Sequence, residues 1–271
     1  EPAALVASSS ATDVLCNGGT ATVTVSAVGG TTPYSGDGTF TVSAGTHSYT
    51  VTDANGCTSS TSITVTEPAA LVASSTQGAA ILCNGGTTTV TVSAIGGTTP
   101  YTGDGSFTVG AGTHNYTVTD ANGCTSSTSI SISEPSAVVV TATQGADILC
   151  NGGSTTVTVS ATGGTSSYTG EGTFTVGAGT HNYTVTDANG CTGSTSITVS
   201  EPAALVASSS ATAILCNGGS ATVTVSATGG TAPYSGDGTF TVTAGTYSYT
   251  VTDANGCTSS TSITVSEPAA L

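Results

Sequence analysis

The sequence predicts an all-β protein, built as a tandem array of small antiparallel Greek-key β-sandwiches. Three observations predict it: a boundary motif that recurs every 66 or 67 residues, short segments in which apolar and polar residues alternate, and two cysteines in every repeat. No segment has the spacing of apolar residues that an amphipathic helix requires.

The boundary motif is the pentapeptide Glu-Pro-(Ala/Ser)-Ala-(Leu/Val). It begins at Glu1, Glu67, Glu134, Glu201 and Glu267. We therefore expect four modules, at residues 1–66, 67–133, 134–200 and 201–266, with residues 267–271 beginning the next repeat. Because the chain starts and stops within this motif and contains no Met, we expect it to be a window from a longer protein.

Each module contains short segments with the alternation of a half-buried strand. The clearest in the first module runs from Thr20 to Val28, and others are expected at residues 5–10, 39–42, 49–52 and 58–66. The side chains expected to face the core are Ala21, Val23, Val25, Ala27, Phe40, Val42, Tyr49, Val51, Ile63 and Val65. Five to seven such strands with frequent turns are typical of an Ig-like sandwich.

Two further motifs place turns and boundaries. Asp53-Ala54-Asn55-Gly56 has the residues of a type I turn followed by a left-handed glycine, which predicts a hairpin tip directly before Cys57. Glu67-Pro68 ends the last strand, because proline has no N–H to extend a ladder. Since the linker Glu-Pro-Ala-Ala-Leu is short and lacks Gly and Ser, we expect neighbouring modules to abut as a stiff rod.

The cysteines predict one internal disulfide in each module. The expected pairs are Cys16 with Cys57, Cys83 with Cys124, Cys150 with Cys191, and Cys216 with Cys257, each separated by the same 41 positions. An even, periodic set without Cys-x-x-Cys favours disulfides in an oxidising compartment over a metal site. On the loop-entropy model such a bond contributes roughly 4 kcal/mol, a large share for so small a core.

The charge balance restricts the partners. The chain has no Lys or Arg and fifteen Asp and Glu residues, which gives a formal net charge of −15. Nothing can meet phosphate, so nucleic acid is excluded as a partner and anionic membranes repel the chain. No continuous apolar run could insert into a membrane. The expected partners are neighbouring repeats, like chains in a filament, surface polysaccharide, and calcium or magnesium counterions.

The order of several motifs resembles a known family. Cys-Asn-Gly-Gly, Gly-Gly-Thr-x-Pro-Tyr, Thr-Val-Thr-Asp-Ala-Asn-Gly-Cys and Ser-Ile-Thr-Val-x-Glu-Pro follow one another as in the SprB-type repeat of large Bacteroidota surface proteins. The resemblance covers all four modules and implies type IX secretion, a cell-surface location, adhesion, gliding or fibre formation, and no catalytic residues. The chain lacks the family's longer, Trp-containing segment between Tyr34 and Phe40, and its third module has Ser166-Ser167-Tyr168 in place of a proline.

Two acidic positions are candidates for a weak calcium site. Asp53 and Asn55 match the Asp-x-Asn that opens many calcium loops, but Cys57 stands where the next oxygen donor belongs, which favours a turn. Asp37 lies between two glycines, and a solvated turn is again the favoured interpretation. No resident cofactor is expected.

The histidines do not predict catalysis. His47, His114 and His181 occupy one position of the repeat, and the fourth module has Tyr247 there, so a plain strand residue is the favoured interpretation. No module combines a nucleophile, a base and an orienting acid, so the chain is not expected to be an enzyme.

These observations favour a structural segment of an extracellular stalk, fibre or adhesin that provides length and stiffness. The alternative is a set of polysaccharide-binding modules that use the Gly-Gly-Thr and Gly-Asp-Gly loops. Ice binding by the threonine-rich faces is a third interpretation, which the twist of short strands disfavours.

Overall fold

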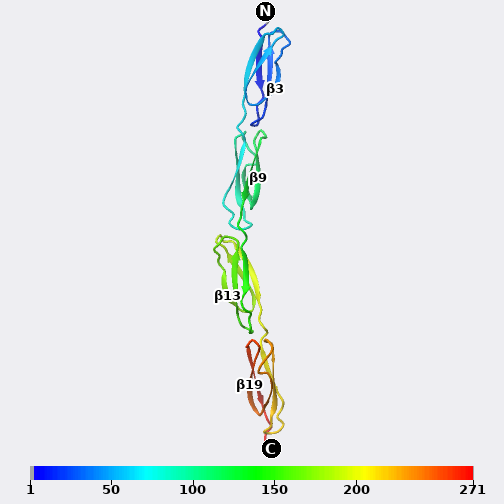
Figure 1. Cartoon of the computed structure of the whole chain (residues 1–271), viewed down its shortest axis with the longest axis vertical. Helices are drawn as coiled ribbons and strands as arrows, with labels where there is room; N and C mark the ends of the chain where they lie inside the picture. The colour runs from blue at the N-terminus through cyan, green and yellow to red at the C-terminus, as the bar shows by residue number, and fades with distance from the viewer. Residues whose placement is uncertain (1–2, 271) are drawn as a thin grey trace. The chain divides into compact units, whose positions relative to one another are not determined.

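A computed structural model of the chain describes residues 3–270 (Figure 1), and these form two compact units, Glu1–Glu134 and Pro135–Leu271. Each unit holds two sequence repeats. Glu1 and Pro2, which open the first expected module, and Leu271, which closes the chain, lie outside the described residues.

Every repeat forms five strands within the described residues. The strands of the first unit are β1 Val6–Ala11, β2 Ala21–Val28, β3 Gly38–Val42, β4 Gly45–Thr52, β5 Thr58–Val65, β6 Val72–Gln77, β7 Thr88–Ile95, β8 Gly105–Val109, β9 Gly112–Thr119 and β10 Thr125–Ile132. Over residues 3–270 there is no helix with the length and apolar character needed to cross a membrane.

The second unit repeats this order of strands. They are β11 Val139–Gln144, β12 Thr155–Thr162, β13 Gly172–Val176, β14 Gly179–Thr186, β15 Thr192–Val199, β16 Val206–Ala211, β17 Ala221–Thr228, β18 Gly238–Val242, β19 Gly245–Thr252 and β20 Thr258–Val265.

The five strands of a repeat form two antiparallel layers. In the first repeat β1, β2 and β3 form one sheet in that order, and β4 and β5 form a hairpin. The hairpin closes against the sheet at both edges: an isolated bridge joins Ser35 to Thr52, and β5 lies beside β1, where Ala7 N donates to Ser59 Oγ at 3.0 Å. β5 runs parallel to β1, since Ser9 Oγ bonds to Thr61 Oγ1 two residues further along both strands, and this contact closes the sandwich at that edge.

Valines fill the space between the layers. Val23 on β2 and Val51 on β4 are fully buried, and the equivalent residues of the other repeats are Val90, Val118, Val157, Val185, Val223 and Val251. Burying each such side chain contributes roughly 1.5 to 3 kcal/mol. Each of the four core clusters draws its residues from one repeat. The predicted all-β sandwich and the predicted inward faces are confirmed.

Candidate functional site

The two cysteines of a module lie at its opposite ends. Cys16 belongs to the loop after β1, and the next residue, Asn17, donates from Nδ2 to the Pro68 carbonyl of the linker that leaves the module, at 3.1 Å. Cys57 follows the β4–β5 turn. This turn lies at the end where the chain enters the module, because Ala54 N donates to Thr31 O and the adjacent Gly30 N donates to Ala3 O. Strands of eight residues span about 26 Å, far more than a disulfide can bridge.

The structure pairs cysteines of neighbouring modules instead. Cys16 bonds to Cys124 and Cys150 bonds to Cys257, each with a Cα–Cα distance of 5.7 Å. The expected internal disulfide is therefore wrong, and its reason is the separation of the two ends of a module. Cys57 and Cys216 are free and exposed, whereas Cys83 and Cys191 are also in the disulfide-bonded state.

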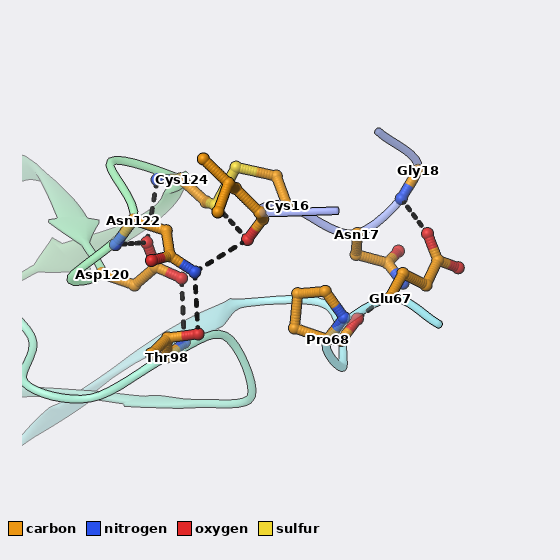
Figure 2. Close-up of a disulfide and its surroundings, with 10 residues drawn as sticks. Cys16, Asn17, Gly18, Glu67, Pro68, Thr98, Asp120, Asn122 and Cys124 are labelled. Atoms are coloured by element: carbon orange, nitrogen blue, oxygen red, sulfur yellow. Dashed lines mark hydrogen bonds between the residues drawn. A yellow bond between two sulfur atoms is a disulfide. The ribbon is translucent and has the colours of Figure 1, made fainter. Parts of the chain in front are cut away.

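The disulfide is accompanied by a hydrogen bond that crosses the same joint (Figure 2). Asn122 Nδ2 donates to the Leu15 carbonyl at 3.0 Å and also to Thr98 Oγ1 at 3.0 Å. Cys124 Sγ lies 3.4 Å from that carbonyl as a contact only, since a disulfide sulfur has no proton to donate. In the second unit Asn255 repeats the bond to the Leu149 carbonyl at 3.2 Å. The joint is thus the same in both units.

The linker is held to the module it leaves by its glutamate. Glu67 Oε2 accepts a hydrogen bond from Gly18 N at 2.6 Å (Figure 2), and Gly18 has the left-handed φ of 77° that directs its N–H there. A charged acceptor makes such a bond stronger than a neutral one. The same bond recurs from Gly85 to Glu134, from Gly152 to Glu201 and from Gly218 to Glu267.

The linker is held to the module it enters by its alanines. Gly97 N donates to Ala69 O at 2.8 Å. Gly96, at a φ of +76°, lies so close that a Cβ there would be 2.0 Å from Ala70 O. A side chain at this position would therefore displace the linker. Together these contacts fix both ends of the five-residue connection.

The Asp-Ala-Asn-Gly turn presents the second cysteine of each joint. Asp120 Oδ1 accepts from the N–H groups of Asn122 and Cys124, each at 2.9 Å, and Oδ2 accepts from Thr98 N at 2.9 Å. Burial is the largest single influence and raises the pKa of Asp120, but these backbone bonds together outweigh it and leave the pKa below its ordinary value of 3.8. The carboxylate therefore stabilises the turn that carries Cys124.

The equivalent carboxylates behave alike. For Asp53 the N–H of Thr31 is the largest cause of a lowered pKa, followed by that of Cys57. For Asp187 and Asp253 the leading causes are the N–H groups of Thr165 and Thr231. All four turns are thus anchored to the loop between the second and third strands of their own module.

The candidate calcium ligands serve this turn or lie in solvent. Asp53 directs both oxygens at N–H donors, and Asn55 Nδ2 donates to Thr31 Oγ1 at 2.9 Å, so neither side chain presents a free set of oxygens to a cation. Asp37 is exposed. Within residues 3–270 no group of three or more His, Cys, Asp or Glu side chains has an arrangement that could hold a metal ion.

The histidines make the same local bond in each module. His47 Nε2 bonds to the Ser43 carbonyl at 2.9 Å, four residues earlier, and Tyr247 OH makes the matching bond to Thr243 O at 3.0 Å. The His114 and His181 rings bond to Gly110 O and Gly177 O. A tyrosine can replace the ring because the bond needs only a donor, which fits a structural role at a strand entry.

The aromatic rings are used mainly by the cores. Tyr34, Phe40 and Tyr49 pack against the first core, with the Phe40 and Tyr49 ring centroids 4.8 Å apart. Sugar-binding sites usually rely on exposed rings, so this packing weighs against the Gly-Gly-Thr and Gly-Asp-Gly loops as a polysaccharide site.

Comparisons with known proteins add little to these observations. No family model matches the chain, and no curated protein matches it. Among solved structures, the N-terminal eight Ig domains of Down Syndrome Cell Adhesion Molecule isoform 1.30.30 align with 11% identity and a TM-score of 0.33, over 99% of this chain and 61% of that one. The fold assignment therefore rests on the strands themselves.

Sequence reasoning found the cysteines but not their joint. The asparagine of Cys-Asn-Gly-Gly and the glutamate of Glu-Pro recur at the repeat period, but neither motif by itself predicts a joint between modules. The signal that could have predicted the joint is that Asn17 and Glu67 repeat with the same period as the cysteines. Asn17, Glu67 and Cys124 lie together at the first joint.

Proposed function

We propose that this chain is a structural segment of an extracellular stalk, fibre or surface adhesin, in which the modules provide length and resist stretching. One observation carries the proposal: the disulfides join neighbouring modules, Cys16 to Cys124 and Cys150 to Cys257. A bond that merely stabilised a small core would lie within one module.

The position of these bonds gives the chain a covalent bypass. A pull applied at the two ends passes from Cys16 directly to Cys124, and the residues between them carry no tension while the bond is intact. The sequence separation is 108 residues, so the bond withholds roughly 370 Å of extensible chain. The Cys150–Cys257 bond, with a separation of 107 residues, does the same in the second unit.

Two properties support a place outside the cell. Disulfides persist in oxidising compartments and are rare where thiols are kept reduced. The chain also has no Lys or Arg, so trypsin-like proteases have no residue to cleave after. Export by the type IX system rests on the resemblance to SprB-type repeats. The proposed role needs no catalytic residue and no cofactor.

Stretching single molecules tests the proposal. The chain is tethered through its two ends and pulled, in a Cys57→Ser, Cys216→Ser background that cannot join other copies. We expect short extension under oxidising conditions, since most of the chain is bypassed, and near-complete extension after reduction with dithiothreitol. A chain that extends equally far in both states would contradict the proposal.

The same measurement distinguishes the two disulfide arrangements. Bonds within single modules would each withhold only 41 residues, roughly 140 Å. Bonds between modules withhold more than twice that length per bond. The double variant Cys16→Ser, Cys124→Ser provides the matched control, because it should lengthen the oxidised chain and leave the Cys150–Cys257 bypass in place.

A further inference from the structure

We propose that the Asn-Gly pair of each Cys-Asn-Gly-Gly loop is a site of spontaneous deamidation, which the bound linker protects and which reacts when the linker leaves the loop. The pairs are Asn17-Gly18, Asn84-Gly85, Asn151-Gly152 and Asn217-Gly218. Glycine after asparagine favours this reaction, because a residue without Cβ leaves its backbone nitrogen unhindered. The inference concerns the chemical lifetime of the joint and does not depend on the proposed function.

The reaction needs two groups of the pair, and the linker holds both. The nucleophile is the glycine nitrogen, and Gly18 N donates its proton to Glu67 Oε2 at 2.6 Å (Figure 2). The leaving group is the side-chain amide, and Asn17 Nδ2 donates to the Pro68 carbonyl at 3.1 Å. While both bonds persist, neither group can turn toward the other. A carboxylate is far too weak a base to deprotonate a backbone amide, so Glu67 fixes the nitrogen and does not activate it.

The same double hold recurs along the chain. Gly152 N donates to Glu201 Oε2 at 2.6 Å, and Asn151 Nδ2 donates to Glu201 Oε1 at 2.9 Å and to the Pro202 carbonyl at 3.1 Å. Equivalent bonds hold the loops of Asn84 and Asn217. The glutamate and the proline of the boundary motif therefore act on each of these pairs.

Packing does not restrain the loop pair. Asn17 and Gly18 are both exposed, and no atom lies within 4 Å of the position that a Cβ of Gly18 would take. Water, which the reaction consumes, therefore reaches the pair directly. The contacts with the linker are what keep it in an unreactive arrangement.

The remaining Asn-Gly pairs provide a comparison within the same chain. They lie in the Asp-Ala-Asn-Gly turns, at Asn55-Gly56, Asn122-Gly123, Asn189-Gly190 and Asn255-Gly256. Gly56 N donates to Asp53 O at 3.0 Å, within one turn, and the same bond recurs in the other three. A turn pair is thus released only when its own hairpin opens. A loop pair is released when a segment 49 positions away leaves it.

The chemistry of a released pair needs only water. Gly18 N attacks Asn17 Cγ, the new N–Cγ bond closes a succinimide ring, and the Cγ–Nδ2 bond breaks. Ammonia leaves with the proton that Gly18 N has lost. Water then opens the ring at either carbonyl and gives aspartate or isoaspartate, so that no oxidant or reductant is involved.

The product cannot rebuild the contacts. At Asn151 a carboxylate oxygen would replace Nδ2, which lies 2.9 Å from Glu201 Oε1, and two negative charges at that distance repel each other. The carboxylate also has no proton to donate to the Pro202 carbonyl. The chain has no Lys or Arg to offset the repulsion. One release that lasts long enough for reaction therefore becomes a permanent weakening of the joint.

Removal of one glutamate tests the protection. The unmodified chain and Glu67→Ala are incubated at neutral pH under oxidising conditions, digested with pepsin in acid, where the reaction is slow, and analysed by mass spectrometry. Asn17 should deamidate roughly tenfold faster in Glu67→Ala, since a bond to a charged acceptor is lost. Asn151, which has the same neighbours in sequence, and Asn55 should keep their rates. Glu201→Ala should reverse the pattern, with a faster reaction at Asn151 and none of the increase at Asn17.

The other outcomes contradict the proposal. An unchanged rate at Asn17 in Glu67→Ala would overturn it, and so would a slower rate, because the carboxylate would then act as a base. Equal acceleration at every Asn-Gly pair would overturn it as well, since the protection would then belong to the whole fold. Glu67→Gln keeps an oxygen that can accept from Gly18 N and should accelerate the reaction less than Glu67→Ala does. Equal rates in these two variants would show that this bond does not protect the pair.

A variant with the charge of the product tests whether the change is permanent. In Asn17→Asp the Gly18 amide hydrogen should exchange with solvent roughly fivefold faster, because the linker is held less well, and the Gly152 amide should keep its rate. Asn151→Asp should give the opposite result. Exchange is measured by nuclear magnetic resonance. A Gly18 amide that is equally protected in Asn17→Asp would show that the linker binds the product as before, and would overturn this part of the proposal.

Discussion

The core of a module and the joint between modules are held together in different ways. The core uses many similar valines, each buried by its neighbours, so its stability is spread over the whole sandwich. The joint uses a few backbone groups and single side chains, such as Gly96, Asn122 and Glu67, each of which makes one specific contact there. The core therefore tolerates changes of apolar shape, whereas the joint depends on the identity of individual residues.

The largest effect is expected in the core. Val90 on β7 is fully buried, so Val90→Ala should reduce the free energy of unfolding by about 2 to 3 kcal/mol. Ile95 on the same strand is 72% exposed, and Ile95→Ala should change it by about 0.5 kcal/mol or less. Urea unfolding measures both, with hydrogen exchange of the β7 amides to localise the loss. Similar losses for the two variants would contradict this account of the core.

The next largest effect is expected at Gly96, the glycine against which the linker lies. Gly96 and Gly85 have the same φ of +76°, but an added Cβ meets Ala70 O at Gly96 and nothing within 4 Å at Gly85. Gly85→Ala should lower the free energy of unfolding by about 1 kcal/mol through backbone strain. Gly96→Ala should lower it by about 1 to 2 kcal/mol more than Gly85→Ala does, because of the clash with the linker. Urea unfolding gives the difference. Faster proteolysis of the 67–71 linker in Gly96→Ala alone would attribute it to the joint.

Two tyrosines of the second module give a smaller contrast. Tyr101 OH donates to Gly96 O at 2.6 Å, so Tyr101→Phe should lose about 1 kcal/mol. The buried Tyr116 hydroxyl has no hydrogen-bond partner among the described residues, so Tyr116→Phe should be neutral or slightly stabilising. Thermal unfolding of the two variants measures the contrast. A larger loss for Tyr116→Phe would show that its hydroxyl is used.

The turn carboxylates should make the stability of the protein depend on pH in acid but not near neutral pH. The folded-state pKa of Asp120 is lowered, so its contribution to stability is complete above the ordinary pKa of 3.8 and is lost as the pH falls through the folded value. We expect the midpoint of thermal unfolding to be constant from pH 7 to about pH 5 and to fall below pH 3.8.

A substitution assigns this acid response to the turn. Asp120→Asn should lower the midpoint at pH 7, because an amide nitrogen would face an N–H donor, and should weaken the fall in acid. Asp104→Asn, at an exposed turn, is the control and should preserve both values. If the midpoint of Asp120→Asn falls in acid as far as that of the unmodified chain, the pH dependence does not come from this turn.

The sequence was sufficient to predict the core and insufficient to predict the joint. Alternation within one strand identifies a buried face, so Val23, Val25 and Val51 could be placed from local sequence alone. The pairing of cysteines depends on which end of a module each one occupies. Their constant spacing could not decide this, because Cys57 and Cys124 are equivalent positions and either lies at a fixed distance from Cys16 in a perfect repeat.

The turn motif has one role that the local sequence predicts and one that it does not. Asp-Ala-Asn-Gly predicted a hairpin tip, and β4 and β5 are joined there. The second role of its asparagine, the bond from Asn122 to Leu15, involves a residue 107 positions away. No local pattern records a contact of that range.

The bond from Cys16 to Cys124 has one more consequence, for damage. It makes the peptide backbone redundant over all the residues it encloses. A single cut in any exposed loop between them, such as the turn at Asp37, leaves two fragments that stay covalently attached. Separation of the two fragments requires both a protease and a reducing agent to act on the same pair of modules. That is a rarer event than the action of a protease alone. Neighbouring modules therefore stay covalently connected after the peptide backbone between the two cysteines has been cut.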